Sequence, residues 1–232
     1  MVPNKRPLLQ QLAAEALGSA LLLCAIVGSG IMGERLSGRN LAVALLANSL
    51  ATGAMLVVLI LTFDAISGAH FNPLVTLSTA WKRLMPWSHV IPYVLSQISG
   101  AFVGILLTHA MFDERLLMIS HHVRSGNGEL LSEFLATFGL LTVIGGNAGH
   151  SRRVLAFSVG AYMMGAYWFT SSTSFANPVV TLARSMTDTF TGIRPADVPG
   201  FIAAQVMGAI AAILFLHWLS SPGENDSLGN TS

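Results

Sequence analysis

The sequence predicts an all-α membrane protein with six transmembrane helices and two half-helices, arranged as two inverted repeats. Three observations lead to this fold class. The composition is strongly apolar, six long apolar segments follow one another, and two short apolar segments begin with the same Asn-Pro pair. The third observation says most about function, because half-helices at matching positions mark transport pathways in membrane proteins.

The composition excludes an ordinary soluble domain. Of the 232 residues, 53% are apolar and only 10% are charged, whereas a soluble domain carries about 25% charged residues. The net charge of +1 gives no reason to expect a nucleic-acid partner. The single cysteine, Cys24, excludes a disulfide framework and a cysteine metal site. We therefore expect membrane lipid as the environment, and we expect no metal and no cofactor.

Six segments approach the roughly 20 apolar residues that a membrane span requires. Loops with charges or turn residues separate them. The predicted spans are 9–32, 41–63, 88–111, 130–147, 154–170 and 198–219. The whole chain, 1–232, is predicted to form one transmembrane domain. Its polar, glycine-rich tail at 221–232 is predicted to be disordered.

Two further apolar segments, 72–83 and 177–188, are too short to span the membrane. Twelve helical residues reach only about 18 Å, which is about half of the hydrocarbon core. Each segment begins with Asn-Pro, and Asn is a good N-cap while Pro suits the first helical position. The preceding residues, SGAHF and SSTSFA, are mostly small or polar. Irregular backbone at this depth is tolerated only where it lines a cavity or is buried in protein.

The two halves of the chain repeat these features in the same order. Three pairs of polar residues align between the halves, Glu15 with Glu133, Asn72 with Asn177, and Gln97 with Gln205. Repeat 1 covers about 9–112, and repeat 2 covers about 129–219. Because three spans are an odd number, the second repeat must enter the membrane from the opposite side. The repeats are therefore inverted.

The pairs Asn72-Pro73 and Asn177-Pro178 form the candidate pore site. Two helix N-termini that meet at the bilayer centre each carry about half a positive charge, which opposes the passage of cations. The side-chain N–H groups of Asn72 and Asn177 can also bind a passing oxygen atom and interrupt a proton wire. The alternative is that both asparagines only cap their helices.

These features together resemble the aquaporin, or major intrinsic protein, superfamily. The motifs SGAHFNP and FANP, Glu15, Glu133 and the internal repeat carry the resemblance, which covers residues 9–219. It implies half-helices that meet at the midplane and a homotetramer with one pore per subunit. It also implies that Glu15 and Glu133 hold the irregular backbone and that His70 lines the inner vestibule. A proton relay through either glutamate, as in a coupled transporter, is the alternative.

The sequence departs from the family's usual Asn-Pro-Ala triplet. Leu74 and Val179 follow the two prolines. Both are bulkier than alanine at a position where the half-helices are expected to pack together. Either the contact between the half-helices is wider, or the neighbouring side chains are smaller.

A second departure concerns the constriction ring, since Val180 stands where the family usually has an arginine. Counting from the motifs places Thr52, Gly165 and Ser174 beside it. Such a ring is small, uncharged and partly apolar, which favours neutral solutes larger than water. Arg184 lies one helical turn farther on, about 6 Å away. It either replaces the missing charge near the mouth, or reaches the interface, or pairs with Asp188.

The second motif, with no arginine after it, resembles a bacterial subset of the family that is associated with arsenic resistance. We therefore expect a passive channel for arsenous acid and glycerol-like solutes, with water as a further candidate. A water-selective aquaporin and a proton-coupled secondary transporter are the alternatives. No nucleophile, base and orienting group converge, so no catalytic residue and no enzyme activity are expected. We expect the bacterial inner membrane as the location, with both termini in the cytoplasm, where basic pairs would border short inner loops.

Overall fold

The structure is a computed structural model that describes residues 6–221, so the predicted tail at 221–232 lies outside the described residues except for Ser221. The described chain is helical and contains no strand. The six long helices are α1 (Leu8–Leu36), α2 (Leu41–Ser67), α4 (Val90–Met111), α5 (Asn127–Gly146), α6 (Arg152–Phe169) and α8 (Val198–Leu219). Between them lie the short helices α3 (Pro73–Trp81) and α7 (Pro178–Arg184), and the 3-10 turns η1 (Trp87–His89) and η2 (Pro195–Asp197). The predicted fold class is confirmed.

Helix boundaries differ from the prediction by a few residues. Helices α1 and α2 run farther than expected, to Leu36 and Ser67. Helix α2 ends there because Gly68 takes the left-handed conformation, with φ of 89°, and its N–H closes the last turn on Asp64 O. Both half-helices are shorter than expected, since α3 ends at Trp81 and α7 at Arg184.

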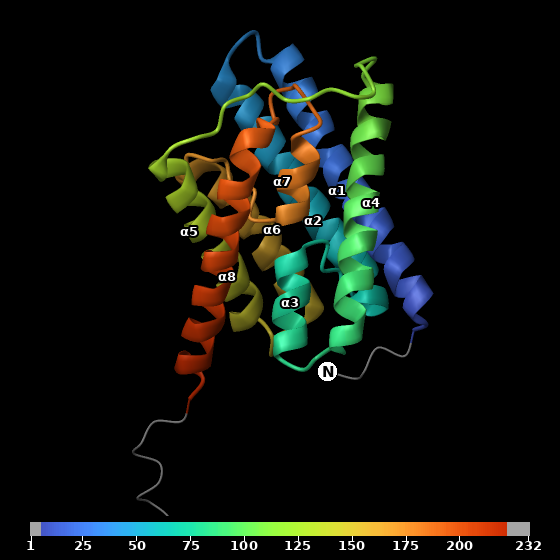
Figure 1. Cartoon of the computed structure of the whole chain (residues 1–232), viewed down its shortest axis with the longest axis vertical. Helices are drawn as coiled ribbons and strands as arrows, with labels where there is room; N and C mark the ends of the chain where they lie inside the picture. The colour runs from blue at the N-terminus through green and yellow to red at the C-terminus, as the bar shows by residue number, and fades with distance from the viewer. Residues whose placement is uncertain (1–5, 222–232) are drawn as a thin grey trace, which may run out of the picture.

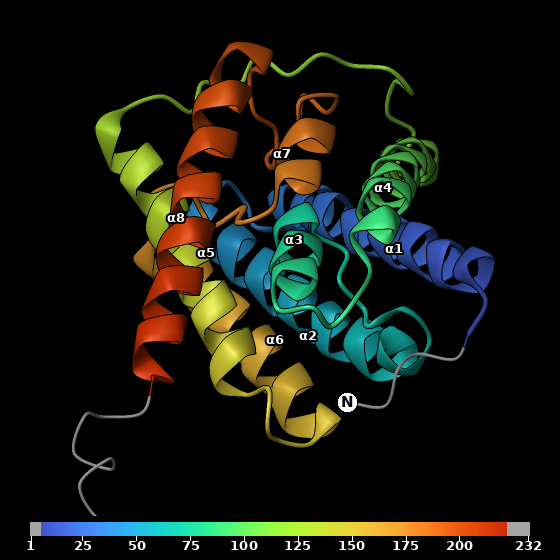
Figure 2. The same ribbon diagram turned by 60° about the horizontal axis from the view of Figure 1, so that its bottom comes forward.

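The two half-helices lie end to end in the middle of the bundle, with their N-termini together (Figure 1). The six long helices are arranged around them (Figure 2). The start of α1 and the end of α8 lie at the same end of the bundle, which is also the end toward which α3 runs (Figure 1). We call this end the α3 mouth and the opposite end, toward which α7 runs, the α7 mouth. The connection 112–126 crosses the α7 mouth (Figure 1).

The helix pairs repeat in the two halves. Helix α1 packs along α4 and α2, helix α5 along α8 and α6, and α2 and α6 join the halves. Glycines let the first pairs approach closely: a Cβ added to Gly100 of α4 would lie 2.0 Å from the Ala16 carbonyl oxygen of α1. Gly208 of α8 would meet the Phe134 carbonyl oxygen of α5 at 2.3 Å. Small residues at such crossings are the usual means of packing helices in membranes.

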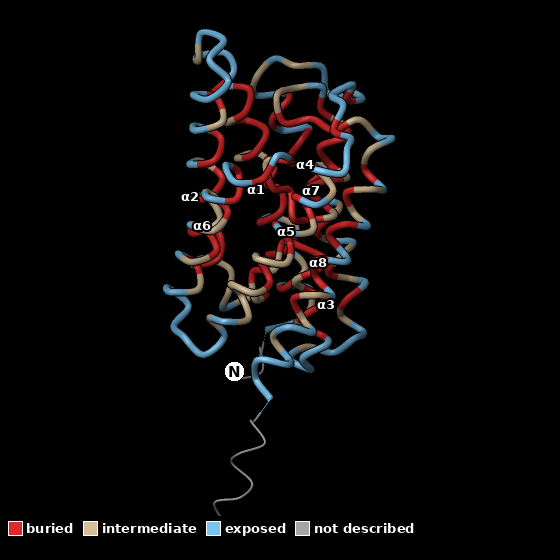
Figure 3. Tube along the Cα trace, turned by 90° about the vertical axis from the view of Figure 1, so that its left-hand side faces the viewer, coloured by how far each residue is buried: buried red, intermediate tan, exposed pale blue. Residues whose placement is uncertain are grey.

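The outer surface of the bundle is apolar. Buried residues face inward, and exposed residues follow the outer sides of the helices (Figure 3). Many of the exposed side chains are large and apolar, for example Leu46, Leu50 and Val58 on α2 and Met207, Ile210 and Leu214 on α8. Among the described residues, 5 helical segments are long and apolar enough to cross a membrane. Helix α6 is not one of them. It has only 18 residues, so a stretch of span length must include the two arginines at its start, which lower its mean hydropathy. The chain is a multi-pass membrane protein.

Gly100→Ala should destabilise the bundle, because its new methyl group meets a backbone oxygen of α1 that cannot rotate away. Overpacking of this kind costs about 1–3 kcal/mol. Thermal unfolding of the purified protein in detergent measures the loss. The control is Gly146→Ala, where a Cβ meets no atom within 4 Å. Equal unfolding temperatures for Gly100→Ala and the wild type would contradict the close α1–α4 crossing.

Candidate functional site

A buried glutamate organises the irregular segment before α3. Glu15 of α1 is 0% exposed. One carboxylate oxygen accepts hydrogen bonds from Ser67 Oγ at 2.6 Å and from the His70 backbone N–H at 2.9 Å. The other accepts from the Phe71 backbone N–H and from Gln97 Nε2, both at 2.8 Å. The carboxylate therefore receives four hydrogen bonds, which compensates for its removal from water.

Glu133 of α5 does the same for the segment before α7, and it is also 0% exposed. Its first oxygen accepts from Ser172 Oγ at 2.6 Å and from the Phe175 N–H at 2.8 Å. Its second oxygen accepts from the Ala176 N–H at 2.9 Å and from Gln205 Nε2 at 2.6 Å. The two halves thus repeat one hydrogen-bond pattern residue for residue, which agrees with the structural role that the family resemblance implies for both glutamates.

These contacts hold a backbone conformation that side chains disfavour. Positive φ angles occur at Ala69 (51°), Phe71 (49°), Ser174 (49°) and Ala176 (48°). For a residue other than glycine, such a conformation costs about 1–3 kcal/mol of free energy, so the surroundings must impose it. The carbonyl groups of residues 69–70 and 174–175 have no hydrogen-bond donor among residues 6–221, and these residues line the central cavity. A water or hydroxyl solute in that cavity would supply the missing donors.

The two asparagines cap their half-helices and also bind across the midplane. Asn72 Oδ1 accepts from the Leu74 N–H at 2.9 Å, and Asn177 Oδ1 accepts from the Val179 N–H at 3.0 Å. Asn72 Nδ2 donates to the Ala176 carbonyl at 2.8 Å, and Asn177 Nδ2 donates to the Phe71 carbonyl at 2.7 Å. Each amide keeps a second N–H, and both asparagines line the cavity.

The bulky residues after the prolines are accommodated by the helices around them. Pro73 and Pro178 each occupy the first turn of their half-helix. Leu74 is 4% exposed and packs in a cluster with Leu141 of α5 and the small residues Ala209 and Ala212 of α8. Val179 belongs to the main apolar cluster of the bundle. Leu74 is therefore packed against two alanines and one leucine, and its larger side chain is not left exposed.

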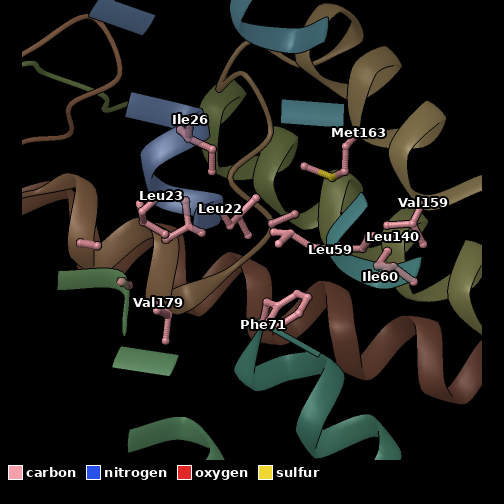
Figure 4. Close-up of a cluster of buried hydrophobic side chains, with 14 of the residues drawn as sticks. Leu22, Leu23, Ile26, Leu59, Ile60, Phe71, Leu140, Val159, Met163 and Val179 are labelled. Carbon is pink, nitrogen blue, oxygen red and sulfur yellow. The ribbon is translucent and has the colours of Figure 1, made fainter. Parts of the chain in front are cut away.

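The central cavity passes between the half-helices and has a volume of about 90 Å³. A water molecule needs roughly 10–15 Å³ of such space, so the cavity has room for several. Its wall is largely apolar and includes Leu22, Ile26, Ile60, Leu140, Val159 and Met163 (Figure 4). Polar groups enter it at few points, which include His70, Asn72 and Asn177.

Three of the four residues predicted for the constriction ring line this cavity. They are Thr52, Ser174 and Val180, which are 1%, 1% and 3% exposed. The placement of Gly165 is wrong. It is exposed on α6, and a Cβ there would meet no atom within 4 Å. Tyr167 lines the cavity instead, and its hydroxyl donates to Thr52 Oγ1 at 3.3 Å. Gly165 lies twelve residues before Asn177 and Tyr167 lies ten before it. Residues two apart on a helix point to nearly opposite sides, so a count that is two residues too long selects a side chain on the wrong face.

The two residues predicted for the vestibules also line the cavity. His70 is half-buried, and its Nδ1 lies 3.1 Å from Thr76 Oγ1. Arg184 is 1% exposed, so it does not extend to the interface. Nor does it pair with Asp188, whose carboxylate bonds to His121. Of the three roles considered for Arg184, only that of a positive charge near the α7 mouth agrees with these contacts.

Sequence reasoning missed Tyr167, Phe175 and Arg124. The ring of Phe175 lies 5.1 Å from the Arg124 guanidinium and 3.4 Å from that of Arg184. Arg124, in the connection that crosses the α7 mouth, donates to the carbonyls of Gly192 and Ser172 at 2.7 and 3.1 Å. Phe175 stands in the FANP motif, which gives no sign of its contacts with arginines, and no repeat or motif marks Tyr167 or Arg124. The alignment of Gln97 with Gln205 did carry a usable signal, because paired polar residues within spans need partners.

Glu133→Gln should destabilise the protein, because an amide group offers one acceptor oxygen where the carboxylate offers two. The donors on the second oxygen, Ala176 N–H and Gln205 Nε2, would face an NH₂ group. Each donor left unsatisfied lowers the free energy of unfolding by about 1–3 kcal/mol. Size-exclusion chromatography and thermal unfolding in detergent measure this loss.

The control for this variant is Glu34→Gln, at an exposed position of α1. A proton relay would give a different result, since Glu133→Gln would then fold as stably as the wild type and lose only transport. That outcome would contradict the structural role of Glu133.

Comparisons with known proteins agree with this geometry. Residues 3–174 match the family model described as "Major intrinsic protein". The chain is 47% identical over 215 residues to "Aquaglyceroporin AqpS" of Rhizobium meliloti (strain 1021), a match that covers 93% of this chain and 92% of that one. It is 32% identical over 212 residues to "Nodulin-26" of Glycine max, over 88% and 76% of the two chains.

The fold also matches a solved structure, the aquaglyceroporin from Plasmodium falciparum. The TM-score is 0.71, the sequence identity is 21%, and the match covers 91% of this chain and 95% of that chain. At this identity the likeness concerns the fold alone. The family model, the relative at 47% identity and the repeated hydrogen bonds of two Asn-Pro half-helices together lead to one conclusion. The chain belongs to the major intrinsic protein family.

Proposed function

We propose that this protein is a passive channel for small neutral solutes with several hydroxyl groups, namely arsenous acid and glycerol-like molecules, with water as a smaller permeant. The single observation that carries the proposal is the position of Val180. It is 3% exposed and lines the same cavity as the two asparagines. The pathway therefore has a short apolar side chain where the family usually has an arginine.

The chemistry of the cavity supports this solute class. A wall of aliphatic side chains cannot replace the hydration shell of an ion, so charged solutes meet a large desolvation penalty. A neutral triol needs only a few hydrogen-bond partners, which Asn72, Asn177 and the free carbonyl groups near them supply. The relative from Rhizobium meliloti bears the name aquaglyceroporin, which supports a solute of glycerol's kind. Arsenous acid, a neutral trihydroxyl compound at pH 7, presents a similar set of hydroxyl groups.

The same geometry favours a passive channel over a proton-coupled transporter. A relay needs a carboxylate that exchanges protons during the cycle, whereas Glu15 and Glu133 are each engaged by four donors and do not line the cavity. A water-selective channel remains the rival within the family, and the permeability measurements below distinguish it. We propose no enzymatic reaction.

We further propose that the chain acts as one channel domain in a homotetramer in the bacterial inner membrane. The apolar outer surface offers area for contacts with lipid and with neighbouring subunits. The α3 mouth, where α1 begins and α8 ends, would face the cytoplasm. Of the basic pairs, Lys82-Arg83 directly follows α3, and Arg152-Arg153 begins α6.

Val180→Arg should reduce uptake of glycerol and arsenous acid by about tenfold or more and should reduce water flow less. The added guanidinium narrows the pathway, and larger solutes lose more than water does. Stopped-flow light scattering on proteoliposomes measures all three permeabilities in one preparation.

The matched control is Val180→Ala, which enlarges the same point and should raise uptake of the triols. If Val180→Arg affected all solutes equally, or had no effect, Val180 would not contribute to solute selectivity. A wild-type protein that conducts water alone would contradict the proposed solute class.

A further inference from the structure

We propose that Arg184 is the fixed cation of this pore, which repels cations at the α7 mouth and donates hydrogen bonds to the hydroxyl oxygens of passing solutes. In this role it would act one helical turn beyond Val180. The inference rests on the proposed function for its solute, while its exclusion of cations can be tested without any solute.

The Arg184 side chain lies on the pathway, beyond Val180. Arg184 ends α7, four residues after Val180, so it lies about 6 Å farther along the helix. It is 1% exposed and lines the same cavity as Val180, Tyr167 and Ser174. The guanidinium is therefore placed on the pathway itself, beyond the point where the ring lacks a charge.

Two contacts hold the guanidinium of Arg184 in place. Arg184 Nε donates to the Thr191 carbonyl, and the guanidinium carbon lies 3.4 Å from the centre of the Phe175 ring. Phe175 is 2% exposed and packs against Phe201 of α8. The Arg184 side chain is thus fixed by a loop carbonyl and an aromatic face, both of which leave its outer nitrogens available.

The outer nitrogens of the Arg184 guanidinium are available to a solute. Nη1 of Arg184 is buried, and neither Nη1 nor Nη2 has an acceptor among residues 6–221. Ser174 Oγ, on the same cavity, is also buried without a partner. Buried donors without acceptors are costly, and a native site that retains them usually completes them with water or a ligand. A solute with several hydroxyl groups offers both the acceptor for Arg184 and a partner for Ser174.

Two buried arginines, Arg184 and Arg124, lie near the α7 mouth. No carboxylate among the described residues forms a salt bridge with Arg184. Glu133, whose carboxylate binds the Phe175 N–H, is saturated by its four donors. Arg124, on the same Phe175 ring, adds a second positive charge. A cation without a carboxylate in direct contact, on a pathway with a largely apolar wall, repels other cations more strongly than it would in water, while it leaves neutral solutes free to pass.

The test compares Arg184→Gln, which keeps a donor but removes the charge, with Arg184→Lys, which keeps the charge. Wild-type and variant channels are reconstituted in liposomes with an internal pH dye, and a potassium diffusion potential drives protons. We expect Arg184→Gln to raise the proton leak about tenfold over the wild type, and Arg184→Lys to stay near the wild type. Arg194→Gln is the matched control, because Arg194 pairs with Asp197 and does not line the cavity.

A proton leak of Arg184→Gln that equals that of the wild type would overturn the inference. Glycerol uptake by the wild type, measured on the same vesicles, tests the proposed function separately, so the two can fail independently. If Arg184→Gln does not assemble, Arg184→Met keeps an unbranched stem over Phe175 and removes the same charge, and its leak is judged by the same criterion.

Discussion

The hydrogen bonds of two buried carboxylates support the rest of this structure. Glu15 and Glu133 each bind two backbone N–H groups, a serine hydroxyl and a glutamine amide. Without such acceptors, the irregular segments could not exist at membrane depth, because lipid offers no hydrogen bonds to exposed backbone. The carboxylates let the chain stop being helical midway through the bilayer and begin a half-helix there.

This arrangement determines what the pathway offers to a solute. The carboxylates take up N–H groups, so the carbonyl groups of the same segments remain available beside the cavity. The asparagines connect the two segments through their Nδ2 donors at 2.7 and 2.8 Å. The remaining wall is aliphatic. A solute therefore meets a few polar groups in an otherwise apolar passage, and its charge and hydroxyl pattern decide whether it passes.

The sequence predicted the parts of this structure that follow from pairing. Two pairs of polar residues stand at matching places in the two repeats, Glu15 with Glu133 and Asn72 with Asn177. Polar residues within a membrane are costly unless they have partners, which limits their roles to a few. The Asn-Pro pairs also marked where the half-helices begin. The element boundaries moved by only a few residues, for example at Ser67, where the left-handed Gly68 ends α2.

The sequence could not predict the contacts that depend on side-chain direction. Gly165 and Tyr167 are two residues apart, and only the packing of α6 shows that Tyr167 faces the cavity. The surroundings of Arg184 likewise depend on three irregular segments, which bring Thr191, Phe175 and the distant Arg124 to the α7 mouth. A single basic residue near the end of a half-helix fits an interfacial position as well as a buried one, so composition alone left its place open.

The central claim is that neutral solutes cross this protein down their own gradient. The most direct measurement is the initial rate of glycerol and arsenous acid entry into wild-type proteoliposomes over a wide concentration range, with and without an imposed pH gradient. A channel predicts rates that rise in proportion to concentration, do not respond to the pH gradient and leave the internal pH unchanged. Saturation at low concentration together with dependence on the pH gradient would contradict the claim and identify a coupled transporter.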